Sequence, residues 1–382
     1  MTPASTSAAA ARRRRFVFAA YMAGGNATIL QNLEDQIAAR PDVASDWLRI
    51  EMDAESKRLD RQPRRPLIPG TIANSLNTGR EIDKLEATGR RFDAAWFFQQ
   101  TICMFLWRFR RRVPYLIGMD GTPMWYVKND LWYAHPPFDP ATLASRLRHE
   151  LTRRVYAQAF QLLPLSATCG QSLIDDYGIP PDRITVVPPG INLATYAMPD
   201  RAAREEGRLP FNVLFVGADF RRKGGDLLVR LAQEPEFRDV QFNLVTKAYE
   251  GPAAPNIRVL DDITPNSAAM VRLLTEADVF ALPTRADSHA IASLEAMAMG
   301  LPVITTPVGG VVEVVVDGET GYFCRKDDID AVAGHLRRLR ADRDLRLRLG
   351  LAGRKRVEER FNAATVAATV VDLLNRAADS RS

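Results

Sequence analysis

Short apolar runs alternate along the chain with longer stretches whose apolar positions recur at a helical spacing. Each short run is bounded by glycine or polar residues, which is typical of a buried strand in a parallel sheet. Strands are therefore expected at 16–21, 92–98, 113–119, 163–167, 211–216, 242–246, 257–260 and 277–282. The intervening stretches are rich in strong helix formers, so the pattern predicts an α/β protein in which strands and helices alternate.

A polar segment at 192–210 divides these strands into two series. Each series suits a doubly wound, Rossmann-like domain, and a chain of 382 residues is long enough for two domains facing each other across a cleft. We expect four parts: a disordered basic tail at 1–15, an N-terminal acceptor-side domain at 16–205, a C-terminal donor-binding domain at 206–365, and a helix and tail at 366–382 that cross back to the N-terminal domain. Residues 41–90 are polar without a clear period, so they predict no functional element.

The stretch 283–300 joins a predicted strand to a predicted helix through a polar turn. Asp287, Ser288 and His289 fall at the N-terminus of this helix and at the carboxyl end of the strand, where ligands bind in open α/β sheets. Free backbone N–H groups and the helix dipole favour an anion such as a phosphate there. Glu295 lies more than a turn inside the helix, and hydroxyl groups of a sugar or ribose would supply the polar partners it needs. The alternative is that Asp287 caps the helix and Glu295 pairs with a basic neighbour.

Glycine-containing loops follow the first strand of each predicted domain. Gly24 and Gly25 precede a helix in the first domain, and glycine lets a ligand approach the backbone closely. The corresponding loop of the second domain adds Arg221, Arg222 and Lys223, whose side chains suit phosphate oxygens. The alternatives are a plain strand-to-helix turn for the first loop and a solvated basic loop for the second.

Asp120 follows another predicted strand and precedes Gly-Thr-Pro. A carboxylate at this edge of a sheet suits a residue that binds an acceptor hydroxyl or takes its proton. The alternative is that Asp120 caps the turn through its own backbone, which is common in Asp-Gly sequences.

The predicted helix at 99–112 combines aromatic residues with the run Arg108-Phe-Arg-Arg-Arg112. Such a surface suits peripheral contact with an anionic membrane, but the pattern also fits a core-facing aromatic stripe with a solvated basic end. Single-stranded nucleic-acid binding uses similar residues. No nucleic-acid-binding motif accompanies them, so nucleic acid is not an expected partner.

The charge and the cysteine content indicate which ligands and which kinds of site the chain can have. A net charge of +5 suits an anionic ligand or an anionic membrane surface. The three cysteines are isolated and have no metal-ligand spacing, which predicts free thiols in a reducing cytoplasm and no metal site. No apolar run is long enough to span a membrane. The acidic residues at 327–330 suit a helix N-cap better than a metal site.

Three motifs resemble those of retaining glycosyltransferases of the large group 1 (family 4) type. The first is Asp287, seven residues, and then Glu295-Ala-Met-Ala-Met-Gly-Leu-Pro-Val-Ile. The second is Tyr177-Gly-Ile-Pro followed by the turn Pro188-Pro-Gly, and the third is Lys223-Gly in the basic loop. The resemblance implies the GT-B fold, in which two Rossmann-like domains enclose a cleft.

The chain departs from the family pattern at three positions. Asp287 stands where glutamate is usual, Ala290 where glycine is frequent, and Ala218 where an arginine often follows the first glycine of the loop. The resemblance then implies that Arg222 or Arg221 takes the place of that arginine.

The resemblance assigns a role to each matching residue. Lys223 and the substituting arginine would bind the donor diphosphate, together with the helix N-terminus at Ser288, His289, Ala290 and Ile291. Glu295 would bind ribose hydroxyls, Asp287 the transferred sugar, and the region of Thr264 the nucleobase. The Gly24-Gly25 loop would face the cleft, and Asp120 would meet the acceptor.

The sequence therefore predicts a cytoplasmic retaining glycosyltransferase that moves a sugar from a UDP- or GDP-sugar to a hydroxyl acceptor in glycan biosynthesis. No metal or other cofactor is expected, peripheral contact with the inner membrane face is a further expectation, and the oligomeric state is left open. One alternative is a non-catalytic protein that binds nucleotide sugars or a membrane surface. Another is an epimerase or phosphorylase on the same fold.

Overall fold

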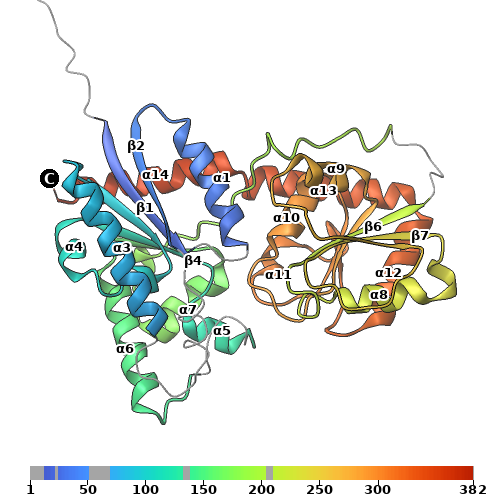
Figure 1. Ribbon diagram of the computed structural model, residues 1–382, viewed down its shortest axis with the longest axis horizontal. Coiled ribbons are helices and arrows are strands. Elements are labelled where there is room, and N and C mark those ends of the chain that lie inside the picture. The colour runs from blue at the N-terminus through green and yellow to red at the C-terminus, as the bar shows by residue number, and fades with distance from the viewer. Residues whose placement is uncertain (1–12, 22–24, 51–68, 132–137, 204–209, 382) are drawn as a thin grey trace, which may run out of the picture.

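Two parallel sheets form two lobes that lie side by side along the long axis of the molecule (Figure 1). The structure is a computed structural model, and it describes residues 13–21, 25–50, 69–131, 138–203 and 210–381. Every strand pairing within the two sheets is parallel, so the predicted fold class of two α/β domains is confirmed.

The N-terminal lobe contains a five-stranded sheet in the order β2-β1-β3-β4-β5. Its strands are β1 (Arg14–Tyr21), β2 (Val43–Ile50), β3 (Ala94–Phe98), β4 (Tyr115–Met119) and β5 (Gln161–Pro164). The helices of this lobe are α1 (Asn26–Ala38), α3 (Pro69–Ala87), α4 (Trp107–Arg112), α5 (Pro123–Lys128), α6 (Leu143–Gln158) and α7 (Ala167–Tyr177), with 3₁₀ turns at Gln100–Ile102 and Pro181–Arg183. The strand order reverses between β1 and β3, so the loops after these two strands lie at a topological switch point.

The C-terminal lobe contains a six-stranded sheet in the order β11-β10-β9-β6-β7-β8. Its strands are β6 (Phe211–Val216), β7 (Val240–Val245), β8 (Ile257–Leu260), β9 (Val279–Leu282), β10 (Val303–Thr305) and β11 (Gly321–Phe323). Its helices are α8 (Gly225–Gln233), α9 (Ala268–Glu276), α10 (Ile291–Ala298), α11 (Val311–Val314), α12 (Ile329–Ala341) and α13 (Arg343–Arg360), with a 3₁₀ turn at Pro235–Phe237. Here the switch point lies between β6 and β9, which places their two following loops next to each other.

The last helix, α14 (Ala363–Asp379), returns from the C-terminal lobe and packs on the N-terminal sheet (Figure 1). The two chain crossings between the lobes lie side by side, because the Ile191 N–H donates to the Phe361 carbonyl at 2.7 Å and the Ala363 N–H donates to the Ile191 carbonyl at 3.0 Å. A Cβ on Gly190 would lie 2.8 Å from the Cα of Ala363. Glycine is therefore needed where the two crossings touch.

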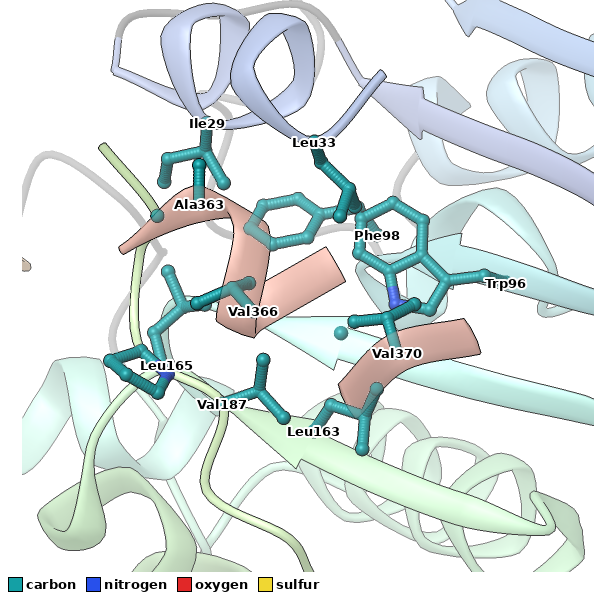
Figure 2. A pocket seen from close by; sticks show the side chains of 13 residues that line it. Ile29, Leu33, Trp96, Phe98, Leu163, Leu165, Val187, Ala363, Val366 and Val370 are labelled. Carbon is teal, nitrogen blue, oxygen red and sulfur yellow. The ribbon is translucent and has the colours of Figure 1, made fainter. Parts of the chain in front are cut away.

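A small apolar cavity lies between α14, α1 and the carboxyl ends of the N-terminal strands (Figure 2). Ile29 and Leu33 of α1 face Val366 and Val370 of α14 across it. The indole N–H of Trp96 is buried at this cavity without a hydrogen-bond partner among the described residues. The apolar lining shows that α14 belongs to the core of the N-terminal lobe.

The expected tail at 1–15 is wrong at its end, because β1 begins at Arg14. Arg14 and Arg15 pair with Val43 and Ala44 of β2, and the Arg15 guanidinium donates to Asp46 at 2.8 Å. The β1–β2 pairing and the contact with Asp46 hold this basic segment in the sheet, although its sequence suggests a solvated tail. Residues 1–12 lie outside the described part of the chain.

The segment 41–90, for which no functional element was predicted, includes the strand β2 and the long helix α3. Its polar sequence does not indicate β2, because β2 is an edge strand. One other expectation about the N-terminal lobe is wrong. The helix expected at 99–112 is a 3₁₀ turn at Gln100–Ile102 and a separate short helix, α4. The backbone of Gln99 has a positive φ of +80°, which a helix does not accommodate.

Two local expectations, the N-cap at Asp328 and the free cysteines, are confirmed. Asp328 caps α12, with its side chain accepting the Ala331 N–H at 2.9 Å, as the N-cap interpretation of the acidic residues requires. The three cysteines are free and buried. None of the helices in the described part of the chain is both long enough and apolar enough to cross a membrane.

Candidate functional site

The loops after β6 and β9 meet at the switch point of the C-terminal sheet. The Arg285 N–H donates to the Arg222 carbonyl at 2.8 Å, which joins the two loops through their backbones. Gly224 has φ +80°, and a Cβ there would lie 2.1 Å from the carbonyl oxygen of Pro283. Only glycine fits both this backbone conformation and this approach. The Gly-Gly pair of the sequence is thus explained by the contact between the two loops.

A buried ion pair joins Lys223 to Asp287 at the centre of these loops. Asp287 is only 5% exposed. Burial alone would raise the pKa of Asp287, but the charges of Lys223 and Arg222 outweigh it and hold that pKa below its usual value. Burial lowers the pKa of Lys223, although Asp287 opposes this effect. The site therefore holds a charged carboxylate and a lysine in an environment poor in water.

Arg222 and Arg221 extend in different directions. The Arg222 guanidinium donates to the Ala286 carbonyl at 2.7 Å and to Asp219 at 3.0 Å, which keeps it beside the Lys223 pair. The Arg221 guanidinium instead pairs with Glu250 on the exposed surface. Of the two arginines that the sequence analysis considered, the structure brings only the Arg222 guanidinium to the ion pair.

The turn before α10 is held in a strained conformation. Ala290 precedes the helix with φ +47° and ψ +60°, the left-handed region in which glycine is favoured. The Ala290 N–H donates to Asp287, and the Gly310 N–H donates to the Ser288 carbonyl at 2.6 Å. Asp287 therefore does not act as the N-cap residue of α10, which is Ala290. The Asp287 carboxylate is held instead by the Lys223 side chain and by the Ala290 N–H.

His289 lies at the seam between the two lobes. Its ring stacks on Trp125 of α5, with 6.2 Å between ring centroids and an angle of 18°. The side chain is 3% exposed, and neither ring nitrogen has a hydrogen-bond partner among the described residues. Burial lowers the pKa of His289 to about 4, against the nearby charges of Asp287 and Glu313. The imidazole is therefore neutral at physiological pH.

Glu295 lies on α10 with its carboxylate buried and 4% exposed. Burial raises the pKa of Glu295 to about 7, which the hydrogen bond to Tyr196 only partly offsets. The alternative that Glu295 pairs with a basic neighbour is thus wrong, since its partner is a neutral phenol. No cation among the described residues pairs with this buried carboxyl, which is therefore ready to accept hydrogen bonds from a ligand.

Tyr196 connects Glu295 to the N-terminal lobe. The Tyr196 hydroxyl lies 2.9 Å from Oδ1 of Asn266 and also contacts Glu295, so its single proton is shared between these two acceptors. The Asn266 amide donates to Asn32 of α1 at 3.1 Å. Thr264, the expected nucleobase neighbour, lies exposed two residues before Asn266. Sequence analysis missed Tyr196 and Asn266, and the positive φ of Asn266 is visible only in the structure.

Asp120 directly follows β4 in the N-terminal lobe, near enough to Asp287 of the other lobe for the two charges to interact. The Tyr126 hydroxyl and the Gln99 amide both donate to its Oδ1, the first at 2.6 Å. Burial raises the pKa of Asp120, and the charge of Asp287 adds to that rise. Thr122 is the N-cap residue of α5. The Asp120 carboxyl also accepts its own backbone N–H, which fits the alternative that it caps the turn.

The loop after β1 faces the start of α10. A Cβ on Gly25 would lie 3.2 Å from the Cγ1 of Ile291, so the two helix N-termini approach each other where the lobes meet. Gly24 lies outside the described residues.

Direct contacts hold the two lobes together at a second place. The Glu313 carboxylate of α11 accepts the backbone N–H groups of Ala167 at 2.9 Å and Thr168 at 3.1 Å, at the N-terminus of α7 in the other lobe. Arg356 of α13 donates to the carbonyls of Glu313 and Val314, at 2.6 and 2.8 Å. Glu313 therefore serves as a structural link between the lobes.

The site contains groups that can bind an anion and carboxylates that can bind hydroxyl groups. Lys223, Arg222 and the N-terminus of α10 can stabilise negative charge in a site that excludes much of the solvent. Asp287, Glu295 and Asp120 can accept hydrogen bonds from hydroxyl groups on both sides of the cleft. This combination suits a ligand that carries both phosphates and sugars.

Two family models match the chain, one in each lobe. The model described as "Glycosyl transferases group 1" matches residues 210–342, and the one described as "Glycosyl transferase 4-like domain" matches residues 36–190. The chain is 32% identical over 220 residues to the D-inositol 3-phosphate glycosyltransferase of Nocardia farcinica, a match that covers 52% of this chain and 49% of the relative. The chain thus spans about half the length of the curated relatives it matches.

Solved structures match nearly the whole chain. Sucrose-phosphate synthase from Thermosynechococcus elongatus has a TM-score of 0.71 at 19% identity, covering 95% of this chain and 99% of that chain. HepE of Anabaena in complex with UDP-glucose has a TM-score of 0.65 at 13% identity, again covering 95% and 99%. At such identities these likenesses establish a common fold.

Proposed function

The chain belongs to the group 1 glycosyltransferases and has their two-domain GT-B fold, and on this premise we propose that it transfers a sugar from a nucleotide-sugar donor to a hydroxyl acceptor. The observation that carries the proposal is the meeting of Lys223, Arg222 and the N-terminus of α10 beside Asp287. A diphosphate leaving group gains negative charge as the glycosidic bond breaks. Cations and N–H dipoles fixed in advance at that point stabilise this charge without having to reorganise.

The donor in this proposal is a UDP- or GDP-sugar. The UDP-glucose held by HepE of Anabaena supports a nucleotide-sugar donor, and the inositol phosphate in the name of the Nocardia relative supports a hydroxyl acceptor. Glu295 would accept hydrogen bonds from the ribose hydroxyls, since it is a buried carboxyl with no cationic partner in the part of the chain that the structure describes. The exposed loop around Thr264 would border the base.

We assign the two facing carboxyl groups to different substrates. Asp287 would accept a hydroxyl of the transferred sugar, while Lys223 bridges it to the diphosphate. Asp120, on the opposite lobe, would accept the hydroxyl of the acceptor, and its raised pKa suits a group that takes up a proton. We propose retention of the anomeric configuration, with the departing diphosphate and the incoming hydroxyl on the same face of the sugar and no carboxylate nucleophile.

A panel of nucleotide sugars tests the donor proposal. UDP-, GDP-, ADP- and dTDP-sugars are compared in thermal-shift measurements on the wild type, on Glu295→Gln, and on the surface control Glu359→Gln. A ligand at a hundred times its dissociation constant stabilises the fold by about 2.7 kcal/mol. We expect one nucleotide to shift the wild type and the control but not Glu295→Gln.

The same panel can refute the proposal. If no nucleotide sugar shifts the wild type, a non-catalytic relative becomes the better conclusion. If the donor binds but is consumed without any acceptor, product analysis would instead indicate an epimerase or a phosphorylase.

A second proposal concerns peripheral contact with the inner face of the membrane, in the cytoplasm. Trp107 at the start of α4 is 58% exposed, and the Arg108 guanidinium lies 5.5 Å from its ring centroid. The Arg110 guanidinium donates to the Tyr115 hydroxyl, and Arg112 forms an ion pair with Glu86. These two arginines therefore stabilise the fold. Phe109 is buried, as the alternative of a core-facing stripe requires.

Co-sedimentation with vesicles tests this surface. We expect salt-sensitive binding to vesicles that contain anionic lipid, and none to neutral vesicles. Because each basic residue near such a surface contributes roughly 1 kcal/mol, Arg108→Gln with Arg111→Gln should weaken binding roughly 30-fold. The control pair Arg230→Gln with Arg258→Gln, on the other lobe, should bind as the wild type does. Equal binding by both pairs, or no binding by the wild type, would rule out the assignment.

A further inference from the structure

Gln99 has a backbone conformation that side chains rarely adopt. Its φ is +80° and its ψ is +138°, well outside the left-handed helical region that Asn and Asp tolerate. The other non-glycine residues with positive φ in the described chain are Asp130, Asn266, Ala290 and Asp327. Three of these four are the Asn and Asp types that suit positive φ. Gln99 is neither, and glycine would occupy its position at much lower cost.

The surrounding structure holds Gln99 in this conformation. Its N–H donates to the Gly118 carbonyl of β4 at 2.8 Å, and the next side chain, Gln100, accepts the Tyr156 hydroxyl at 3.0 Å. Gln99 directly follows β3, so it stands at the switch point of the N-terminal sheet. The strain is thus located at the carboxyl edge of the N-terminal sheet, beside Asp120.

The Gln99 side chain makes one specific contact. Its amide donates to Oδ1 of Asp120, the same oxygen that accepts the Tyr126 hydroxyl. The two donors come from opposite sides in the sequence, one before Asp120 and one after it. Two donors on one oxygen fix the orientation of the whole carboxyl group. A glycine at position 99 would relax the backbone but would remove one of them.

Burial raises the pKa of Asp120 and favours its uncharged carboxyl form. Tyr126 of α5, Tyr156 of α6 and Cys169 of α7 lie near it, and burial raises the pKa of the latter two. Asp287, from the opposite lobe, adds a negative charge that raises the pKa of Asp120 further. The hydrogen bonds from Gln99 and Tyr126 oppose this rise. They therefore affect both the direction and the basicity of the carboxyl group.

We propose that Gln99 is a positioning residue, kept in a strained backbone so that its amide, together with Tyr126, orients the Asp120 carboxyl group toward the acceptor hydroxyl. The inference rests on the proposed transferase function. It goes beyond that function because it assigns a purpose to a residue that need not touch either substrate.

Two variants of Gln99 separate the strain from the amide. Gln99→Gly removes both, whereas Gln99→Met removes only the amide and keeps a side chain of similar length. We expect the turnover number of both variants to fall at least tenfold, with little change in the KM for the donor. Only Gln99→Gly should unfold at a higher urea concentration than the wild type.

The pH profile supplies a readout that a purely structural role would leave unchanged. Loss of the Gln99 donor should raise the pKa of Asp120, so the acidic limb of the turnover profile should move to higher pH in both variants. Tyr126→Phe, which removes the other donor to the same oxygen, should shift this limb in the same direction. The carboxyl resonance of Asp120 in NMR reports the same pKa without any turnover.

The outcomes distinguish this inference from the transferase proposal. If the wild type transfers no sugar, the NMR titration and the urea midpoints still test whether Gln99 controls Asp120. A Gln99→Gly variant with wild-type turnover, or with a lower urea midpoint, would overturn the inference. So would an Asp120 pKa that is the same in the wild type and in both variants.

Discussion

Lys223→Met is expected to lower both the turnover and the stability of the protein, each by a large factor. The lysine is the partner of a carboxylate that is 5% exposed, and removing one partner of a buried ion pair costs roughly 3–5 kcal/mol. Loss of a group that stabilises the leaving diphosphate should lower the turnover number roughly 100- to 1,000-fold. Urea unfolding and steady-state kinetics measure the two effects.

A second substitution separates the two effects of losing Lys223. In Lys223→Met with Asp287→Asn, no buried charge remains unpaired, so most of the stability should return while turnover stays low. Lys355→Met provides a matched control, since Lys355 is exposed and its oxygen partner on Glu359 is 3.8 Å away. That change should cost at most about 1 kcal/mol. If the double variant regained activity, Lys223 would have only a structural role.

Glu295→Gln is expected to stabilise the free protein at alkaline pH while abolishing donor binding. The pKa of Glu295 is raised from 4.5 to about 7 in the fold, so the folded state binds the proton more tightly than the unfolded chain. Stability from this group is therefore present at acidic pH and is lost as pH rises from about 4.5 to about 7. A shift of this size corresponds to roughly 3 kcal/mol, which the neutral glutamine would restore at pH 8.

The measurement is the difference in unfolding free energy between variant and wild type at pH 5 and pH 8. The difference isolates Glu295, because His289, with its pKa lowered to about 4, contributes an opposite slope between about 4 and 6.5 in both proteins. Donor affinity of the wild type should also fall as pH drops below about 7, since ribose hydroxyls donate to the ionised carboxylate. An equal free-energy difference at both pH values would contradict the assignment of a buried, raised carboxyl group.

Much of the fold could be predicted from local sequence. The run 211–216 matches β6, because a buried strand needs mostly apolar residues whatever surrounds it. The run 257–260 also matches a strand, β8, although this edge strand is only partly buried. The edge strand β2 and the helix α3 could not be found in the same way. Their partners lie elsewhere in the lobe, and their sequences carry the charges of a partly solvated surface.

The candidate site, like the fold, has some features that the sequence shows and others that only the structure shows. The types and spacing of Lys223, Asp287 and Glu295 were readable because they belong to one motif and one glycine loop. The pairing of Lys223 with Asp287, and of Glu295 with Tyr196, joins residues 64 and 99 positions apart, respectively, in the chain. No local pattern in the sequence indicates such pairs. Only the three-dimensional structure could therefore reject the alternatives that Asp287 caps α10 and that Glu295 pairs with a basic residue.

The sequence by itself determined the fold class, the family and the chemical types gathered at the cleft, because these depend on local periodicity and on short motifs. The tertiary structure decided which of two arginines reaches the ion pair, which carboxyl groups are charged, and that Gln99 holds a strained backbone beside Asp120. Burial, pairing and strain are properties of distant segments brought together. They arise only when the two sheets and the two lobes are in place.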